Sequence, residues 1–260
     1  MEELKISIIT VCFNSVGTIT ETINSVLAQT YPHIEYIVVD GASSDGTSEL
    51  ISSYGTKISK LISEPDKGMY DAINKGIRVS TGEIIGILNS DDIFYDKKVI
   101  EKVAEAFNDI NLGVIISDVQ FVDPENTSKV IRYYSSRNFK PSRFRFGFMP
   151  AHPGFYAKKE LFDKFGYYKT DYKIAADYEL EMRFLLTNHV SYKYLEMPVV
   201  SMRTGGISNK SILSNYILNK EIGRACKENG LKTNYIFIYS KYLIKIFQFF
   251  GNRKKNGINV

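Results

Sequence analysis

The sequence predicts an α/β fold in which a mostly parallel β-sheet carries helices on both faces and is followed by a C-terminal helical extension. Short apolar runs rich in β-branched residues, such as Ile84–Leu88, alternate with segments whose apolar residues recur at helical spacing. Uniformly apolar strands of this kind are typical of parallel sheets that helices cover on both sides. Polar residues follow several of these runs, and open α/β sheets bind their ligands beyond the carboxyl ends of strands.

The first 118 residues carry the alternating part of the pattern. The expected strands are Ile6–Phe13, Ile34–Val39, Ile58–Ser63, Ile84–Leu88 and Gly113–Ile116, the last of them ending at Asp118. Between them, helices are expected to start at Thr18, Ser48, Met69 and Asp96. This order indicates a mononucleotide-type half with right-handed crossovers.

The pattern changes after Asp118. Val119–Val122 and Val130–Tyr134 predict a β-hairpin grafted onto the parallel half. Phe139–Phe148 is rich in aromatic residues and arginine without a clear period, which indicates a loop over a substrate cleft or an interaction surface. The remaining expected elements are helices at Glu160–Phe165 and Ile174–Leu186, a strand at Tyr192–Leu195 and a glycine loop at Arg203–Asn209.

The last fifty residues predict two helices, Ile212–Asn229 and Tyr235–Phe250, with Gly230 between them. The second is dominated by large apolar and aromatic residues, but it is short for a membrane span and contains two lysines. The basic segment Arg253–Lys255 after it favours an interfacial helix. A helix docked on the rest of the chain or on a second subunit is the alternative.

Composition narrows the classes of protein. A net charge of +4 over 260 residues is too small to argue for a nucleic-acid partner. Cys12 and Cys226 lack CxxC spacing, which predicts neither a disulfide framework nor a zinc site and indicates a reducing compartment. The first residues lack the pattern of a signal peptide, so we expect a cytoplasmic protein.

Polar residues cluster at the ends of four predicted strands, which share one rim in a doubly wound sheet. These residues are Thr10 with Asn14, Asp40, Asp66 with Lys67, and Asn89 to Asp92. The carboxylates Asp91 and Asp92 suit Mg²⁺ or Mn²⁺, ions that typically also hold substrate phosphates. A simple helix cap is the alternative for Asp92. Neither GxGxxG nor GxxxxGK[ST] occurs, which argues against a dinucleotide oxidoreductase and a P-loop kinase.

Three segments resemble, in order and spacing, the family 2 glycosyltransferases of the GT-A fold. They are Ile6–Val11 with Asn14, Ile37–Thr47 and Gly82–Asp92. The resemblance implies a nucleotide-sugar donor, usually a UDP-sugar, a Mg²⁺ or Mn²⁺ ion, and inversion at the anomeric carbon. It also implies that residues 1–118 of a 1–210 domain bind the nucleotide-sugar and residues 119–210 bind the acceptor, with 211–260 as the extension.

The resemblance assigns roles on the donor side. Thr10 and Asp40 match positions that contact the uracil and ribose, whereas Gly41 stands where many members have a second acidic residue. Asn89–Asp91 matches the DxD motif with Asn89 in place of its first aspartate. Metal binding then rests on Asp91, with Asp92 as a second candidate.

On the acceptor side, Asp177 matches the family's catalytic carboxylate, and Glu179 is a rival base. An inverting transfer needs one such carboxylate within reach of the acceptor hydroxyl. His152 is either a metal or phosphate contact or a packed core histidine, and Lys67 is either a contact to the base or phosphates or an exposed turn residue. Arg203 resembles part of the flexible loop that folds over the diphosphate.

We therefore expect a metal-dependent inverting glycosyltransferase that adds one sugar to a surface glycan or a lipid-linked precursor at the cytoplasmic membrane face. A sugar nucleotidyltransferase is the alternative enzyme, although residues 10–17 lack the glycine-rich basic loop that would hold a triphosphate. A non-catalytic nucleotide-sugar-binding scaffold protein is the alternative outside enzymes. Peripheral membrane contact through residues 235–255 and a homo-oligomer are further expectations that the sequence leaves open.

Overall fold

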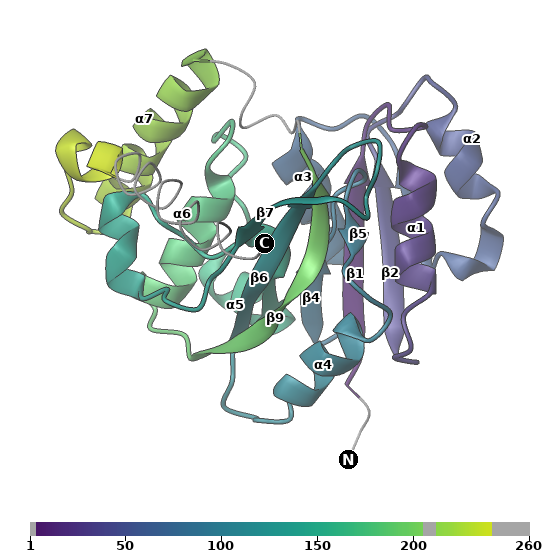
Figure 1. The fold of residues 1–260 in the computed structure, drawn as a ribbon, viewed down its shortest axis with the longest axis horizontal. Coiled ribbons are helices and arrows are strands. Elements are labelled where there is room, and N and C mark those ends of the chain that lie inside the picture. The colour runs from purple at the N-terminus through teal and green to yellow at the C-terminus, as the bar shows by residue number, and fades with distance from the viewer. Residues whose placement is uncertain (1–3, 205–211, 241–260) are drawn as a thin grey trace, which may run out of the picture.

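The computed structural model describes residues 4–204 and 212–240, which form one mixed sheet with helices on both faces (Figure 1). The nine strands run in the order β3-β2-β1-β4-β8-β6-β9-β5, and β7 pairs with β6 outside this path. Their bounds are β1 (Ile6–Cys12), β2 (Ile34–Asp40), β3 (Lys60–Ser63), β4 (Ile84–Ile87), β5 (Ile93–Phe94), β6 (Val114–Val122), β7 (Val130–Tyr134), β8 (Phe155–Lys158) and β9 (Tyr192–Arg203).

The N-terminal part of the sheet is parallel, as predicted. β1 pairs in parallel with both β2 and β4, and β2 pairs in parallel with β3. The carboxyl ends of these four strands therefore meet at one edge. β8 runs antiparallel between β4 and β6, so that the residues just before β8 lie at the same edge as those just after β4.

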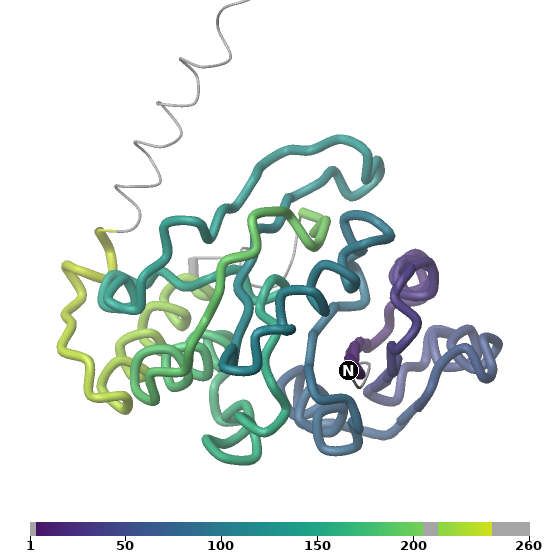
Figure 2. Tube along the Cα trace, turned by 90° about the horizontal axis from the view of Figure 1, so that it is seen from below, coloured from purple at the N-terminus to yellow at the C-terminus, as the bar shows by residue number. Residues whose placement is uncertain are grey.

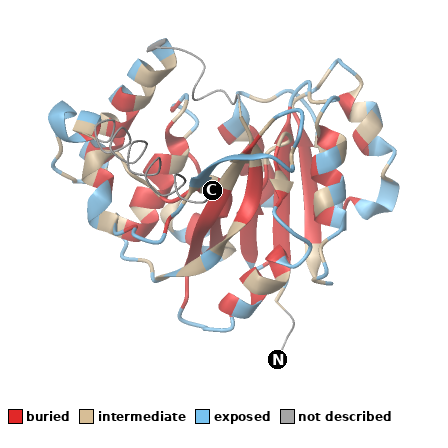
Figure 3. Cartoon of the chain, in the orientation of Figure 1, coloured by how far each residue is buried: buried red, intermediate tan, exposed pale blue. Residues whose placement is uncertain are grey.

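Each face of the sheet is covered by its own set of helices. Their bounds are α1 (Ile19–Leu27), α2 (Thr47–Ser52), α3 (Met69–Val79), α4 (Val99–Ala106), α5 (Lys159–Phe165), α6 (Ala176–Met182) and α7 (Ile212–Glu228). One core joins β1, β2, β4 and β6 to α3, α5, α6 and α7, and a second joins the opposite side of these strands to α1, α2 and α4. The central strands are buried throughout (Figure 3).

The N-terminal helices α1 and α2 lie at the opposite end of the molecule from α7 in both views (Figures 1 and 2). Short helices fill the connections: η1 (Gly55–Lys57), η2 (Pro141–Phe146), η3 (His152–Gly154) and the π-helical η4 (Arg183–Thr187), which continues α6. Gly230 follows α7 with a φ of +71°, a conformation that suits its predicted role as the helix stop.

Several element predictions are wrong, and the differences lie mainly in the second half. The strand predicted to end at Asp118 continues, because β6 runs through to Val122 with register shifts on either side of Asp118. β5 and β8 were not predicted, and β9 reaches Arg203 rather than ending near Leu195. The division predicted at residue 118 thus falls inside a strand.

The aromatic segment Phe139–Phe148 was predicted as a loop, but it contains η2 and contributes to the core. Phe139 and Phe144 are buried, and the Phe144 ring meets that of Tyr178 edge-on with 5.3 Å between centroids. The prediction of a helix at Tyr235–Phe250 is described only to residue 240, where residues 235–240 are helical, and the rest lies outside the described residues. Within the described ranges, no helix combines the length and apolarity needed to cross a membrane.

Candidate active site

The end of β2 places Asp40 at the carboxyl edge of the sheet. Its side chain is fully buried and accepts hydrogen bonds from the Ser63 hydroxyl at 2.7 Å, from the Ser43 hydroxyl and from the Ser43 amide. These contacts join the ends of β2 and β3. Asp40 therefore organises this corner of the rim, and a ligand would reach the main chain around it.

The loop after β3 brings Asp66 against Gly41. A Cβ atom at Gly41 would lie 2.5 Å from Oδ2 of Asp66, so any side chain at this position would collide with that carboxylate. Asp66 Oδ1 also accepts the amide hydrogen bond of Gly68 at 2.7 Å. Asp66 thus places a carboxylate against Gly41, and the exposed Lys67 follows it in the loop.

Thr10 and Asn14, the two candidate site residues at the end of β1, lie in different environments. Thr10 is fully buried and its hydroxyl accepts a hydrogen bond from the Tyr36 hydroxyl at 3.2 Å, so it lies in the core below the rim. Asn14 is exposed with a φ of +49°, and its Oδ1 accepts the Ser44 amide hydrogen bond at 2.9 Å. Asn14 therefore ties the β1 turn to the β2 turn.

The turn after β4 presents the polar run Asn89–Asp92. The Asn89 amide donates to Asp92 Oδ2 at 3.2 Å, and the Ser90 and Ser15 hydroxyls lie 2.9 Å apart. Asp92 is 2% exposed, and burial together with the charge of Asp91 raises its pKa. No helix begins at Asp92, because the two-residue strand β5 follows it.

Arg203, the last residue of β9, braces this turn. Its guanidinium donates to the Asp91 carbonyl oxygen at 2.7 Å and pairs with Glu21 of α1 at 2.6 Å. Arg203 was predicted to belong to a flexible glycine loop, but it lies in β9, and residues 205–211 lie outside the described residues. Arg203 thus places positive charge beside the two carboxylates.

A divalent ion at the turn after β4 would need carboxylate oxygens that the protein leaves open. The Asp91 side chain is partly exposed, and among residues 4–204 and 212–240 no partner is assigned to its carboxylate. No group of three or more His, Cys, Asp or Glu side chains in those ranges is arranged around one point. One open carboxylate nevertheless suits Mg²⁺ or Mn²⁺, since such ions take their other ligands from water and substrate phosphates.

Across the same edge, Asp177 lies in the first turn of α6. The residue as a whole is partly exposed, and its Oδ1 accepts the Tyr178 amide hydrogen bond at 2.8 Å. Burial raises the pKa of Asp177, while His152 and the Tyr178 amide oppose that rise. The rival Glu179 is fully buried and paired with Arg183 at 2.8 Å and Lys169 at 2.9 Å.

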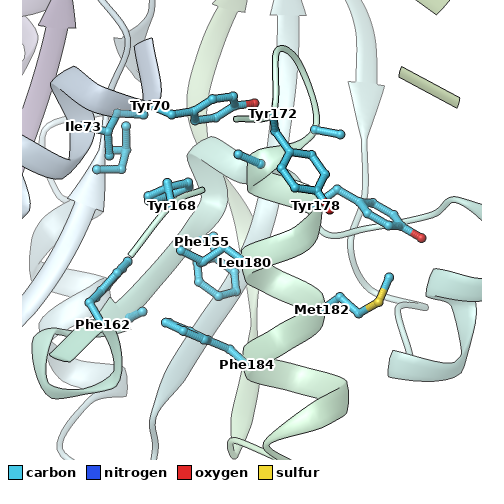
Figure 4. Packing of buried hydrophobic residues seen from close by; sticks show 14 of the residues in the cluster. Tyr70, Ile73, Phe155, Phe162, Tyr168, Tyr172, Tyr178, Leu180, Met182 and Phe184 are labelled. Carbon is cyan, nitrogen blue, oxygen red and sulfur yellow. The ribbon is translucent and has the colours of Figure 1, made fainter. Parts of the chain in front are cut away.

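Aromatic side chains from three segments surround Asp177. The Tyr70 hydroxyl of α3 donates to the Ile174 carbonyl oxygen and lies 3.5 Å from Asp177 Oδ1. The Tyr70 ring stacks on that of Tyr168 with 5.8 Å between centroids, above the packed rings under α6 (Figure 4). The His152 ring meets Tyr168 edge-on, and its Nε2 lies 2.9 Å from the Tyr168 hydroxyl.

His152 belongs to η3, just before β8, and thus lies at the edge where the β4 turn begins. Its Nε2 lies beside the Tyr168 hydroxyl and its ring lies in the electrostatic field of Asp177, whereas within residues 4–204 and 212–240 no hydrogen bond or ion pair joins it to Asp91. Burial lowers the pKa of His152. His152 is therefore a neutral neighbour of Asp177 near neutral pH.

Glu221 of α7 holds the loop that leads into α6, a role that the sequence did not reveal. Its carboxylate accepts the backbone amide hydrogen bonds of Lys173, Ile174 and Ala175 at 2.7, 2.9 and 2.9 Å. Carboxylates that accept several amide hydrogen bonds fix a backbone firmly. The extension therefore helps to position Asp177, although Glu221 is distant in sequence.

Glu181 lies one turn after Asp177 on the same side of α6. It is fully buried, and among the described residues neither of its carboxylate oxygens has a hydrogen-bond partner. Burial and the charge of Asp177 raise the pKa of Glu181 well above its ordinary value. A buried acid without partners should cost free energy of folding.

We expect Glu181→Met to raise the free energy of unfolding by about 1–3 kcal/mol at pH 8. The unfolded chain releases the Glu181 proton above its ordinary pKa while the folded chain retains it, so the penalty grows with rising pH. Urea unfolding at pH 5 and pH 8 should show the larger gain at pH 8. Glu179→Gln, which breaks the pairs with Arg183 and Lys169, should instead destabilise the fold. An equal loss of unfolding free energy in Glu179→Gln and Glu181→Met would contradict the conclusion that Glu181 lowers stability.

Comparison with known proteins agrees with this arrangement. The family model described as "Glycosyl transferase family 2" matches residues 7–165. An uncharacterized glycosyltransferase of Mycobacterium tuberculosis is 32% identical over 184 residues, which cover 70% of this chain and 69% of the relative. A PGL/p-HBAD biosynthesis glycosyltransferase of Mycobacterium bovis is 25% identical over 215 residues, covering 81% of this chain and 82% of the relative.

Solved structures are similar in fold. S. aureus TarS matches with a TM-score of 0.67 at 21% identity over 85% of this chain, which spans only 39% of TarS. A shorter TarS structure in complex with UDP-GlcNAc gives 0.65 at 19% identity, covering 85% of this chain and 66% of that one. A mannosyltransferase from Pyrobaculum calidifontis with GDP-Man and Mn²⁺ gives 0.60 at 19% identity, covering 88% and 64%. At these identities the likeness concerns the fold.

Proposed function

Because this chain belongs to glycosyl transferase family 2, we propose that it is an inverting, metal-dependent enzyme that moves a sugar from a UDP-sugar to a glycan or lipid-linked acceptor. Its GT-A fold, predicted from the sequence, is confirmed by the structural likeness. The observation that carries the proposal is the contact made by Tyr70, which lies in the first turn of α3, just after Asp66 and Lys67, and donates a hydrogen bond to the loop before Asp177. One edge of the sheet thus joins a candidate donor side to a candidate base.

The donor side of the proposed site consists of the turns after β2, β3 and β4. Asp66 and Lys67 would meet the nucleoside or its phosphates, together with the main chain around the buried Asp40. Asn89 would offer an amide to the ribose or to a bound water. Asn14 would act indirectly, through the β1 turn that it holds. A TarS complex with UDP-GlcNAc supports the choice of a UDP-sugar. The buried Thr10 supports the rim from below.

Asp91 is the residue that we propose to hold Mn²⁺ or Mg²⁺, because its carboxylate faces no protein partner in the described part of the chain. When bound, such an ion neutralises charge that grows on the leaving nucleoside diphosphate. Arg203 keeps the Asp91 main chain in place and adds positive charge nearby. Asp92, which is buried and bonded to Asn89, supports the turn.

Asp177 is proposed as the general base. In an inverting transfer, the acceptor hydroxyl attacks the anomeric carbon from the side opposite to the leaving diphosphate, and Asp177 takes its proton as the new glycosidic bond forms. Tyr70, Tyr168 and Glu221 hold the carboxylate and its loop in place. Residues 119–210, which include Asp177, would supply the acceptor half of the site.

We further propose that the enzyme works at the cytoplasmic face of a membrane, in the biosynthesis of a surface polysaccharide. A relative named for a biosynthetic glycosyltransferase supports a biosynthetic role. The apolar and basic composition of residues 235–255 supports peripheral contact with the membrane that would carry a lipid-linked acceptor.

The test is a donor screen in which purified protein and Mn²⁺ are mixed with UDP-, GDP- and dTDP-sugars and the released nucleoside diphosphate is measured. We expect release from a UDP-sugar, and its loss when EDTA removes the metal. Donor binding without turnover under any condition would instead select the scaffold protein. Formation of a nucleotide-sugar from a sugar phosphate and a nucleoside triphosphate would select the nucleotidyltransferase.

A further inference from the structure

A pocket of about 790 Å³ opens between the C-terminal part of α7 and the turn that follows it. We call it the C-terminal basic pocket, and its walls include Lys220, Arg224, Lys227, Lys232, Tyr235 and Ile238. It lies at the α7 end of the molecule, and none of the residues of the proposed donor and base sites lines it.

Among the described residues, the walls of this pocket carry positive charge and no carboxylate. Arg224 is neutralised by Asp171 and Glu228, both of which bond its guanidinium. Lys220, Lys227 and Lys232 are exposed, and within residues 4–204 and 212–240 no ion pair is assigned to them. Three ammonium groups without a protein counter-charge favour an anionic ligand.

Large apolar side chains stand beside the pocket in the helical residues 235–240. Tyr235 is 60% exposed, Ile236 is 79% exposed and Tyr239 is 44% exposed. Phe237, at 39% exposure, is the fourth exposed apolar residue within these five positions. Single exposed apolar residues are common, but four within five positions beside a basic pocket are a candidate interaction surface.

The same segment is anchored firmly on its inner side. Ile238 is buried against Gly223, where its Cδ1 lies 3.7 Å from the place of an added Cβ. The Phe237 ring packs on Phe146 with 5.4 Å between centroids. The outward-facing residues Tyr235 and Ile236 are therefore presented on a fixed support.

We infer that the C-terminal basic pocket binds the phosphate groups of anionic phospholipids while Tyr235, Ile236 and Tyr239 enter the membrane interface. A bilayer surface offers anionic phosphates and apolar chains within a few ångströms of each other, which matches the two adjacent features. A free phosphate would engage the lysines but leave the apolar side chains in water. This lipid site rests on the membrane location proposed above, and these side chains would hold the protein there.

The sequence beyond residue 240 has a matching composition, since an apolar run with two lysines leads to Arg253–Lys255. Aromatic residues beside lysines are typical of segments that lie at the membrane surface. The C-terminal basic pocket would thus supply the part of this contact that the described residues make.

Vesicle flotation of the full chain tests the inference, with vesicles of phosphatidylcholine alone or mixed with phosphatidylglycerol. We expect binding only to the mixed vesicles and weaker binding at high salt. The triple variant Lys220→Glu/Lys227→Glu/Lys232→Glu should lower the partition coefficient by roughly 100-fold or more. The control is Lys97→Glu/Lys98→Glu/Lys193→Glu, which changes the net charge equally at exposed positions outside the pocket and should keep most of the binding.

A second variant, Tyr235→Ser/Ile236→Ser, should weaken the binding that survives high salt. Equal binding to both vesicle types, or an equal loss in the two triple variants, would overturn the inference. Binding of inorganic phosphate to the pocket without any vesicle binding would assign it to a free anion and overturn the membrane source.

UDP release from donor in vesicle-free solution separates this inference from the proposed function. Wild type and both triple variants should release UDP equally, which also shows that the variants are folded. Turnover without vesicle binding would rule out the lipid site and leave the proposed function standing. Vesicle binding that depends on the three lysines, without turnover on any donor, would leave the lipid site standing and remove the catalytic proposal.

Discussion

Replacing Asp177 with asparagine should lower kcat/KM for sugar transfer by roughly 10²–10⁴-fold while donor affinity stays unchanged. Asparagine matches the shape of aspartate and can still accept the Tyr178 amide hydrogen bond, but it cannot take a proton from the acceptor hydroxyl. Steady-state kinetics and donor titration by calorimetry measure the two quantities separately.

The pH dependence adds a second readout for Asp177. A base must be ionised, so kcat/KM should fall as the pH drops through the pKa of Asp177. An exposed aspartate has a pKa of about 4. Because burial raises the pKa of Asp177 above that value, the fall in kcat/KM should come at a higher pH than for an exposed aspartate. The residual kcat/KM of Asp177→Asn should not show this fall at low pH.

Two other carboxylates provide controls for Asp177. Asp171, in the preceding loop, pairs with Arg224 at the surface, and Asp171→Asn should leave kcat/KM within a few-fold. Glu179→Gln should reduce stability, because Glu179 is buried in ion pairs and no acceptor can reach it. Full kcat in Asp177→Asn, or a loss of kcat in a stably folded Glu179→Gln, would move the base to another residue.

The parallel half of the fold could be predicted because its signals are local. Ile84–Leu88 is apolar at every position, and a strand buried on both faces needs nothing else to be recognised. The prediction ended a strand at Asp118 because a carboxylate usually marks a strand end. Here Oδ2 of Asp118 accepts hydrogen bonds from the Tyr133 and Tyr194 hydroxyls, each at 2.7 Å, and Oδ1 accepts the Ser136 amide hydrogen bond at 2.7 Å, so the strand continues past it.

Much of the candidate site also follows from local motifs, since Asp40, Asp66 and the Asn89–Asp92 turn all come to one edge of the sheet. The parts that could not be predicted depend on contacts between distant segments. Tyr70 reaches a carbonyl 104 positions away, and Glu221 bonds amides 46–48 positions before it. No period or motif marks such residues, because any tyrosine or glutamate on a helix has the same local pattern.

Replacing Asp91 with asparagine should lower kcat by roughly 10²–10³-fold and raise the Mn²⁺ concentration needed for half-maximal activity. The amide keeps the size of the side chain but removes the charge that a divalent ion requires. Titration with UDP in the presence and absence of Mn²⁺ should show that the variant loses the part of its affinity that depends on metal.

Asp92→Asn is the matched control, because the two carboxylates are adjacent in sequence but differ in environment. Asp92 is buried, accepts a hydrogen bond from Asn89 and has a raised pKa, so a neutral amide should replace it with little loss of kcat. If Asp91 holds the metal alone, the two variants should differ by at least roughly tenfold in kcat. Equal losses would mean that both carboxylates bind the ion, and a loss confined to Asp92→Asn would transfer the metal site from Asp91 to Asp92.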